Sequence, residues 1–179
     1  MLERLLTLLT LDALPRTGWL QAGLRDVESI AAHSHGVTLL ALVLGEQVEP
    51  DLDLDRCVAL CAVHDVPEAL LGDFPRHASQ LLPEGAKATA ETRAAELLLG
   101  GPEGAARQRF DEYARGETRE ARFARVCDKL HLGLRGFGYA RAGHRNLDTF
   151  RTSLERLDCA EFPTAVALQQ AILGAWARL

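Results

Sequence analysis

The residues of this 179-residue chain that could do chemistry are histidines and acids in three widely separated segments. His33 lies within an apolar stripe, and His64 and Asp65 directly follow a strongly apolar segment. Asp128 lies in the sequence Ala-Arg-Val-Cys-Asp-Lys-Leu. Burying such groups is costly unless each finds a partner. Imidazoles and carboxylates that converge in a core suit a divalent transition metal. Two His and two Asp ligands would leave positions for water and a substrate.

These residues also have a plain structural interpretation. A histidine on an apolar face can be a core residue whose nitrogens are satisfied by hydrogen bonds. Asp128 can cap a helix or form a salt bridge, and His64-Asp65 is a dipeptide that chance alone produces at this composition. The order His, His-Asp, Asp along the chain favours a shared site, but spacing alone leaves both interpretations open.

Helices must position these residues, because apolar residues recur at spacings of three and four along almost the whole chain. The segment 57–63 is apolar all round, so it should be a buried helix, and Pro67 should end or kink it. We expect a loop at about residues 72–83. The pattern predicts helices at about residues 1–14, 28–46, 57–63, 84–99, 103–115, 118–138, 146–157 and 165–179.

Composition limits the class of protein. No run of alternating β-branched residues is long enough for a strand, so we expect an all-α fold and one domain over residues 1–179. With 47% hydrophobic residues and a net charge of −5 the chain should fold, and it lacks the basic character of a nucleic-acid polymer binder. No apolar run is long enough to span a membrane, and the charges in residues 1–14 argue against a signal peptide. The 4 cysteines form no C-x-x-C pair, which predicts buried free thiols in a cytoplasmic protein.

Several short motifs together resemble one family. The order His33, His64-Asp65, Asp128 is similar to the metal signature of the HD-domain phosphohydrolases, and most similar to the branch of HD-domain 5′-deoxynucleotidases. The resemblance runs over about residues 4–135. The supporting motifs are Leu-Pro-Arg-Thr-Gly-Trp at 14–19, Glu-Ser-Ile-Ala-Ala-His at 28–33, Asp-Arg-Cys at 55–57, Val-His-Asp-Val-Pro-Glu at 63–68 and Gly-Asp-Phe-Pro at 72–75. It implies an HD-domain helical bundle with its core signature at about residues 28–135 and C-terminal helices at about 146–179.

The resemblance implies one metal centre. Its four ligands would be His33, His64, Asp65 and Asp128, and they would hold one divalent transition metal cation. These ligand types accept Mn, Fe, Co, Ni or Zn. Such a cation lowers the pKa of a bound water and polarises a phosphoryl group.

The resemblance also implies roles around the metal. Glu68 would act as general base or proton shuttle, and Asp73 would orient the attacking water or protonate the departing sugar oxygen. Arg16 would grip phosphate oxygens, and Trp19 would form a wall of the nucleotide pocket. The alternatives are a helix-end acceptor for Glu68, a turn residue for Asp73, a surface ion pair for Arg16 and plain core for Trp19.

The expected function is hydrolysis of deoxyribonucleoside 5′-monophosphates, which are small-molecule substrates, to deoxynucleoside and phosphate. Another HD phosphohydrolase activity or a non-catalytic binding module are the alternatives. Guanosine tetraphosphate hydrolases carry a second acid where this chain has Ala69, which argues against that activity. The G-Y-P motif of cyclic-dinucleotide phosphodiesterases is missing, which argues against that activity as well. Residues 76–85 match nothing firmly, and His35 and His77 fall beside site residues without matching the signature. The apolar C-terminal helix should pack on the core or form a homodimer.

Overall fold

The computed structural model describes residues 1–48 and 50–179, and within these residues the chain forms twelve α-helices and no β-strand. The all-α fold expected from the sequence is therefore confirmed. The helices are α1 (Leu2–Leu8), α2 (Thr10–Ala13), α3 (Thr17–Gln21), α4 (Ile30–Gly45), α5 (Leu54–Val63), α6 (Glu68–Leu71), α7 (Arg76–Leu81), α8 (Ala86–Leu99), α9 (Ala105–Arg115), α10 (Arg119–Arg141), α11 (Asp148–Glu155) and α12 (Pro163–Trp176).

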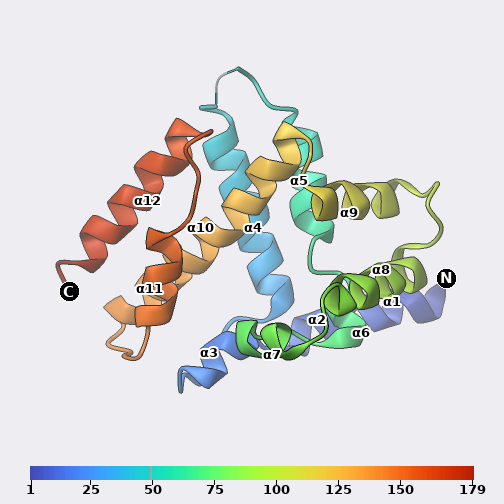
Figure 1. The fold of residues 1–179 in the computed structure, drawn as a ribbon, viewed down its shortest axis with the longest axis horizontal. Coiled ribbons are helices and arrows are strands. Elements are labelled where there is room, and N and C mark those ends of the chain that lie inside the picture. The colour runs from blue at the N-terminus through green and yellow to red at the C-terminus, as the bar shows by residue number, and fades with distance from the viewer. Residues whose placement is uncertain (49) are drawn as a thin grey trace.

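Three helices, α4, α5 and α10, pack against one another and form the centre of the bundle (Figure 1). α11 and α12 lie along α10 on one side, whereas α9 packs on α5 and α10. The short helices α1, α2 and α6 pack together with the longer α8 at the other end. The segments that carry the candidate ligands therefore lie in α4 and α10 or directly after α5.

Side-chain caps fix where the three central helices begin. Ser29 accepts a hydrogen bond from the Ala32 backbone amide at the start of α4. Asp53 does the same for α5, and Thr118 for α10. Such caps satisfy backbone donors that have no partner within the helix. The register of each central helix, and so the direction of its polar side chains, is thereby set.

The core consists of aliphatic, small and aromatic side chains from α3, α4, α5, α10 and the C-terminal helices. Trp19, Phe123 and Phe162 are its largest fully buried side chains. Phe123 and Phe162 contact each other edge to face, with ring centroids 5.0 Å apart. Such aromatic pairs add stability beyond the area they bury.

Most of the predicted helices are present, with differences at four short segments. The predicted helix at 1–14 is two helices, α1 and α2, which join at Leu9. The predicted loop at 72–83 contains α7, and the helices α3 and α6 were not predicted. α2 and α6 have four residues each, α3 has five and α7 has six, too few for an apolar repeat to show in the sequence.

The C-terminal helix α12 packs back on the core, as one of the two expectations had it. Ile172 and Trp176 are buried, and the Trp176 ring lies against Gly136 of α10. All four cysteines are buried and free, which confirms the prediction from their spacing. Among the described residues, no helix combines the length and the apolar character that crossing a membrane requires.

Candidate metal centre

The four residues expected as metal ligands come from three helices. His33 lies in the first turns of α4, and Asp128 lies in the middle of α10. His64 is the C-terminal cap of α5, and the turn that follows carries Asp65. Pro67 has no backbone N–H to donate, so α5 cannot continue, and the chain turns into α6 at this point.

The structure brings these residues together at a buried point. The His33 Nε2 atom lies 3.1 Å from Asp128 Oδ1 and 3.8 Å from Asp65 Oδ2. The His64 Nε2 atom lies 3.1 Å from Asp65 Oδ2. Ligands about 2.1 Å from a shared metal ion lie about 3 Å from one another. His33, His64 and Asp65 thus form a group whose ligand atoms are all close enough to share an ion.

The hydrogen bonds of His64 favour metal binding. Its Nδ1 atom donates to the Cys61 carbonyl oxygen at 2.7 Å, which orients the ring. Its Nε2 atom is buried and has no hydrogen-bond partner, although the Asp65 carboxylate is near. A neutral imidazole leaves this buried nitrogen without a partner, and a protonated one pairs it with Asp65; a metal ion would bind the nitrogen and the carboxylate together. The residues present therefore fit a divalent cation.

Glu68 lies at the start of α6, beside this group. It is buried, and its Oε2 atom has no hydrogen-bond partner. Burial, together with repulsion from Asp65 and Asp73, raises the pKa of Glu68 to about 9. A carboxyl group in such an acidic pocket holds a proton at neutral pH and releases it when positive charge arrives.

Arg16 and Asp73 lie together at the edge of the site. Arg16 Nη1 donates to Asp65 Oδ2 at 3.2 Å and lies 3.8 Å from Asp73 Oδ1. The other oxygen of Asp73 accepts from the Thr17 backbone amide, and the Thr17 hydroxyl donates to the Asp73 carbonyl oxygen. Asp73 thus holds the start of α3, and with it Arg16, against the site.

The expectation that Trp19 walls the nucleotide pocket is not met by the structure. Trp19 is 0% exposed, stacks on Phe150 with ring centroids 4.0 Å apart and packs edge to face on Tyr139. No face of the indole is open to a base or sugar. Its Nε1 atom donates to Glu28 Oε1 at 3.0 Å. Trp19 is therefore a core residue, as the alternative interpretation predicted, and its indole N–H holds the Glu28 carboxylate in place.

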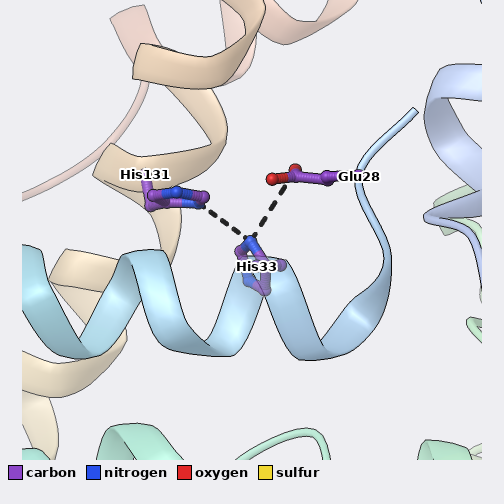
Figure 2. A group of neighbouring side chains, drawn as sticks. All are labelled: Glu28, His33 and His131. Atoms are coloured by element: carbon purple, nitrogen blue, oxygen red, sulfur yellow. Dashed lines mark hydrogen bonds and ion pairs between the residues drawn. The ribbon is translucent and has the colours of Figure 1, made fainter. Parts of the chain in front are cut away.

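Three residues that sequence reasoning missed contact the candidate ligands. Tyr113 of α9 donates from its hydroxyl to Asp128 Oδ2 at 3.3 Å, and Lys129 Nζ lies 2.7 Å from the same oxygen. Burial would raise the pKa of Asp128, but Lys129 and His33 hold it well below its usual value. His131 lies beside His33 (Figure 2). Only His131 had a signal in the sequence, since it follows Asp128 by about one helical turn.

The other histidines near the motif take different positions. His35 is exposed on α4 and lies with Leu11 and Val66 at a separate hollow. His77 is exposed on α7, within the segment 76–85 that matched no motif.

An all-helical bundle in which imidazoles and carboxylates from separate helices meet at one buried point is a protein that can hold a metal ion. The chain belongs to the HD-domain family, because the sequence profile described as HD domain matches residues 10–161. The family expected from the sequence motifs is thereby confirmed.

Individual proteins and solved structures are also similar to this chain. A 5′-deoxynucleotidase of Schizosaccharomyces pombe is 29% identical over 150 residues, which are 78% of this chain and 73% of that protein. A human 5′-deoxynucleotidase is 28% identical over 75% of this chain and 66% of its own length. The crystal structure of a Pyrococcus horikoshii protein superimposes with a TM-score of 0.84 and 31% identity, covering 98% of this chain and 99% of that one.

Proposed function

We propose that this chain is a metal-dependent phosphohydrolase that converts deoxyribonucleoside 5′-monophosphates to deoxynucleoside and inorganic phosphate. The observation that carries the proposal is the buried His33–His64–Asp65 group with Asp128 beside it. The similarity to 5′-deoxynucleotidases over three quarters of the chain supports the choice of substrate.

Four of the chain's residues would hold the cation: His33, His64, Asp65 and Asp128. A divalent metal supplies a Lewis acid that lowers the pKa of water and polarises the phosphoryl group. The ligand types favour Mn, Fe, Co, Ni or Zn over the hard cations that prefer oxygen alone. One cation per chain is the proposed stoichiometry.

Glu68 is proposed to take the proton from the attacking water and pass it toward the departing sugar oxygen. Its burial and its acidic neighbours hold its pKa near 9 until positive charge arrives, so it can exchange a proton close to neutral pH. Arg16 is proposed to bind the phosphate oxygens, since its guanidinium already lies among the carboxylates of the site. Asp73 positions Arg16 through the Thr17 amide.

Phosphate release from a panel of deoxyribonucleoside and ribonucleoside monophosphates tests the proposal. We expect hydrolysis of the deoxyribonucleotides with added Co²⁺ or Mn²⁺, and its loss with a chelator. Hydrolysis of triphosphates but of no monophosphate would overturn the substrate, and full activity in chelator would overturn the metal.

Two variants separate the proposed roles. His64→Ala should lose bound metal and turnover together, whereas Glu68→Gln should keep the metal and lose turnover by roughly 100-fold or more, the usual contribution of a general base. His35→Ala and Glu46→Gln, which change exposed residues of the α4 segment, are the matched controls. The homodimer and the cytoplasmic location stay predictions, and light scattering of the purified protein tests the first.

A further inference from the structure

We propose that His131 is a positioning residue that fixes the orientation and the proton position of His33, so that His33 presents its Nε2 atom to the metal. The inference rests on the metal centre of the proposed function and adds a residue to it. His131 does not reach the ligand group itself, since it contacts the far side of the His33 ring.

The geometry places the two nitrogens of His33 in different surroundings. Its Nε2 atom faces the carboxylates of Asp128 and Asp65. Its Nδ1 atom lies 3.0 Å from the Nδ1 atom of His131, on the opposite side of the ring. Figure 2 shows that His131 of α10 and Glu28, from the segment before α4, both face the same nitrogen of His33, Nδ1. His33 is fully buried, so neighbouring side chains surround its ring.

Only one proton arrangement satisfies both sides of His33 when its Nε2 atom binds a metal. A metal ligand nitrogen must be deprotonated, so the proton of His33 must lie on Nδ1. That N–H needs an acceptor, and the His131 Nδ1 atom is at hydrogen-bond distance. His131 then carries its own proton on Nε2. The acceptor thereby selects the tautomer of His33 that binds metal.

Glu28 cannot replace His131 as this acceptor. Its nearest oxygen to His33 Nδ1, Oε1, is 4.0 Å away and already accepts from Trp19 Nε1. Its second oxygen accepts from Arg135 Nε at 2.9 Å. The carboxylate is therefore held in place by two donors, and a hydrogen bond to His33 is left to His131.

The His131 ring can approach His33 because the residue that it packs against on α4 is a glycine. Gly36 of α4 lies against the His131 ring, and a side chain carbon at position 36 would collide with it. His33 and Gly36 are three residues apart, so they share one face of α4. The small residue lets the imidazole of α10 approach the helix that carries His33.

Metal affinity of the purified 179-residue chain tests the proposal, with Co²⁺ as the probe. His131→Leu fills similar space without an acceptor, and His131→Asn returns an oxygen near the position of Nδ1. Loss of such an outer partner typically weakens metal binding by about 10–100-fold, so we expect that loss for Leu and a value within roughly threefold of wild type for Asn. Equal weakening in both variants, or none in Leu, would overturn the proposal.

A measurement on the unmodified protein covers the case in which His131→Leu does not fold. Nitrogen-15 NMR of the Zn²⁺-loaded chain reports which imidazole nitrogens carry protons. We expect a proton on His33 Nδ1 and none on His131 Nδ1, with one Zn²⁺ bound per chain. A metal on His33 Nδ1, or a second Zn²⁺ held by Glu28, His33 and His131, would overturn it.

These readouts are separate from turnover. If the chain bound Co²⁺ in a way that depended on His131 but hydrolysed no nucleotide, the proposed function would fail and the positioning role would stand. If it hydrolysed nucleotides while His131→Leu bound Co²⁺ like wild type, the positioning role alone would fail. His35→Asn, an exposed histidine on the same helix, should change neither readout.

Discussion

The guanidinium of Arg16 contacts the carboxylate of Asp65, with Arg16 Nη1 3.2 Å from Asp65 Oδ2. This pair joins the N-terminal segment to a candidate metal ligand that lies 49 residues further along the chain. Burial disfavours the charge of Arg16, but Asp65 and Asp73 hold its pKa above the ordinary value. A permanent cation thus lies beside the place where we expect a phosphate group to bind.

Removing this guanidinium should impair substrate binding. A hydrogen bond to a charged group contributes about 1.5–3 kcal/mol, so Arg16→Ala should lower kcat/KM for deoxyribonucleoside monophosphates by roughly 10–100-fold, mainly through KM. Steady-state kinetics with a saturating metal measure it. Arg25→Ala changes an exposed arginine and is the control. An unchanged KM in Arg16→Ala would contradict the proposed phosphate contact.

Metal binding should release protons at neutral pH. Burial alone would lower the pKa of His64, but Asp65 raises it to about 9, so the imidazole is protonated below that pH. Because the metal needs the neutral imidazole, affinity should rise with pH up to about 9. Calorimetric titration with Zn²⁺ in two buffers of different ionisation enthalpy counts the protons. We expect at least one per metal at pH 7, and identical heats in both buffers would contradict the pKa direction.

The sequence identified the candidate ligands better than their surroundings. His33, His64, Asp65 and Asp128 are polar residues in apolar helical segments and are expensive to bury, and the resemblance to the HD-domain phosphohydrolases assigned them as ligands. The contact of Tyr113 with Asp128 depends on how α9 packs on α10. Residue spacing does not show how two helices pack, so this contact could not be predicted from the sequence. The burial of Trp19 depends likewise on Phe150 and Tyr139, which are more than 100 residues away.

Glu112 should make stability depend on pH. Its carboxylate accepts from Arg56, Arg109 and Thr118. Burial would raise the pKa of Glu112, but the hydrogen bonds from Thr118 and Arg56 lower it below its usual value of 4.5. The Arg56 and Arg109 donors are a third or more exposed, so losing the charge that they pair with should cost less than a fully buried hydrogen bond does. Glu112→Gln should lower the free energy of unfolding by about 1 kcal/mol at pH 7.

The sign of the pH effect follows from the lowered pKa of Glu112. A carboxylate with a lowered pKa stabilises the fold above its unfolded pKa, near 4.5, and this stability is lost as the pH falls through the folded pKa. The difference between wild type and Glu112→Gln should therefore be full at pH 6–7 and shrink below about pH 4.5. Urea denaturation at several pH values checks it, and a constant difference would show that the charge plays no part.

Two glycines of α10 should respond to alanine in opposite directions. A side chain at Gly133 would lie 2.7 Å from Leu154 of α11, whereas a side chain at Gly138 meets nothing within 4 Å. Overpacking costs about 1–3 kcal/mol, and alanine gains up to about 1 kcal/mol over glycine in a helix. Gly133→Ala should lower the free energy of unfolding, and Gly138→Ala should raise it. Chemical denaturation measures both, and a stabilised Gly133→Ala would contradict the close packing of α10 and α11.

His33 and Asp128 are 95 residues apart in the chain and 3.1 Å apart in the fold. The candidate centre therefore exists only once α4, α5 and α10 have assembled, and an unfolded chain offers the ion no comparable site. By mass action, a cation at 100 times its dissociation constant would shift the folding equilibrium by about 2.7 kcal/mol toward the native state. The supply of the ion would then govern resistance to proteolysis and the lifetime of the protein as well as its chemistry.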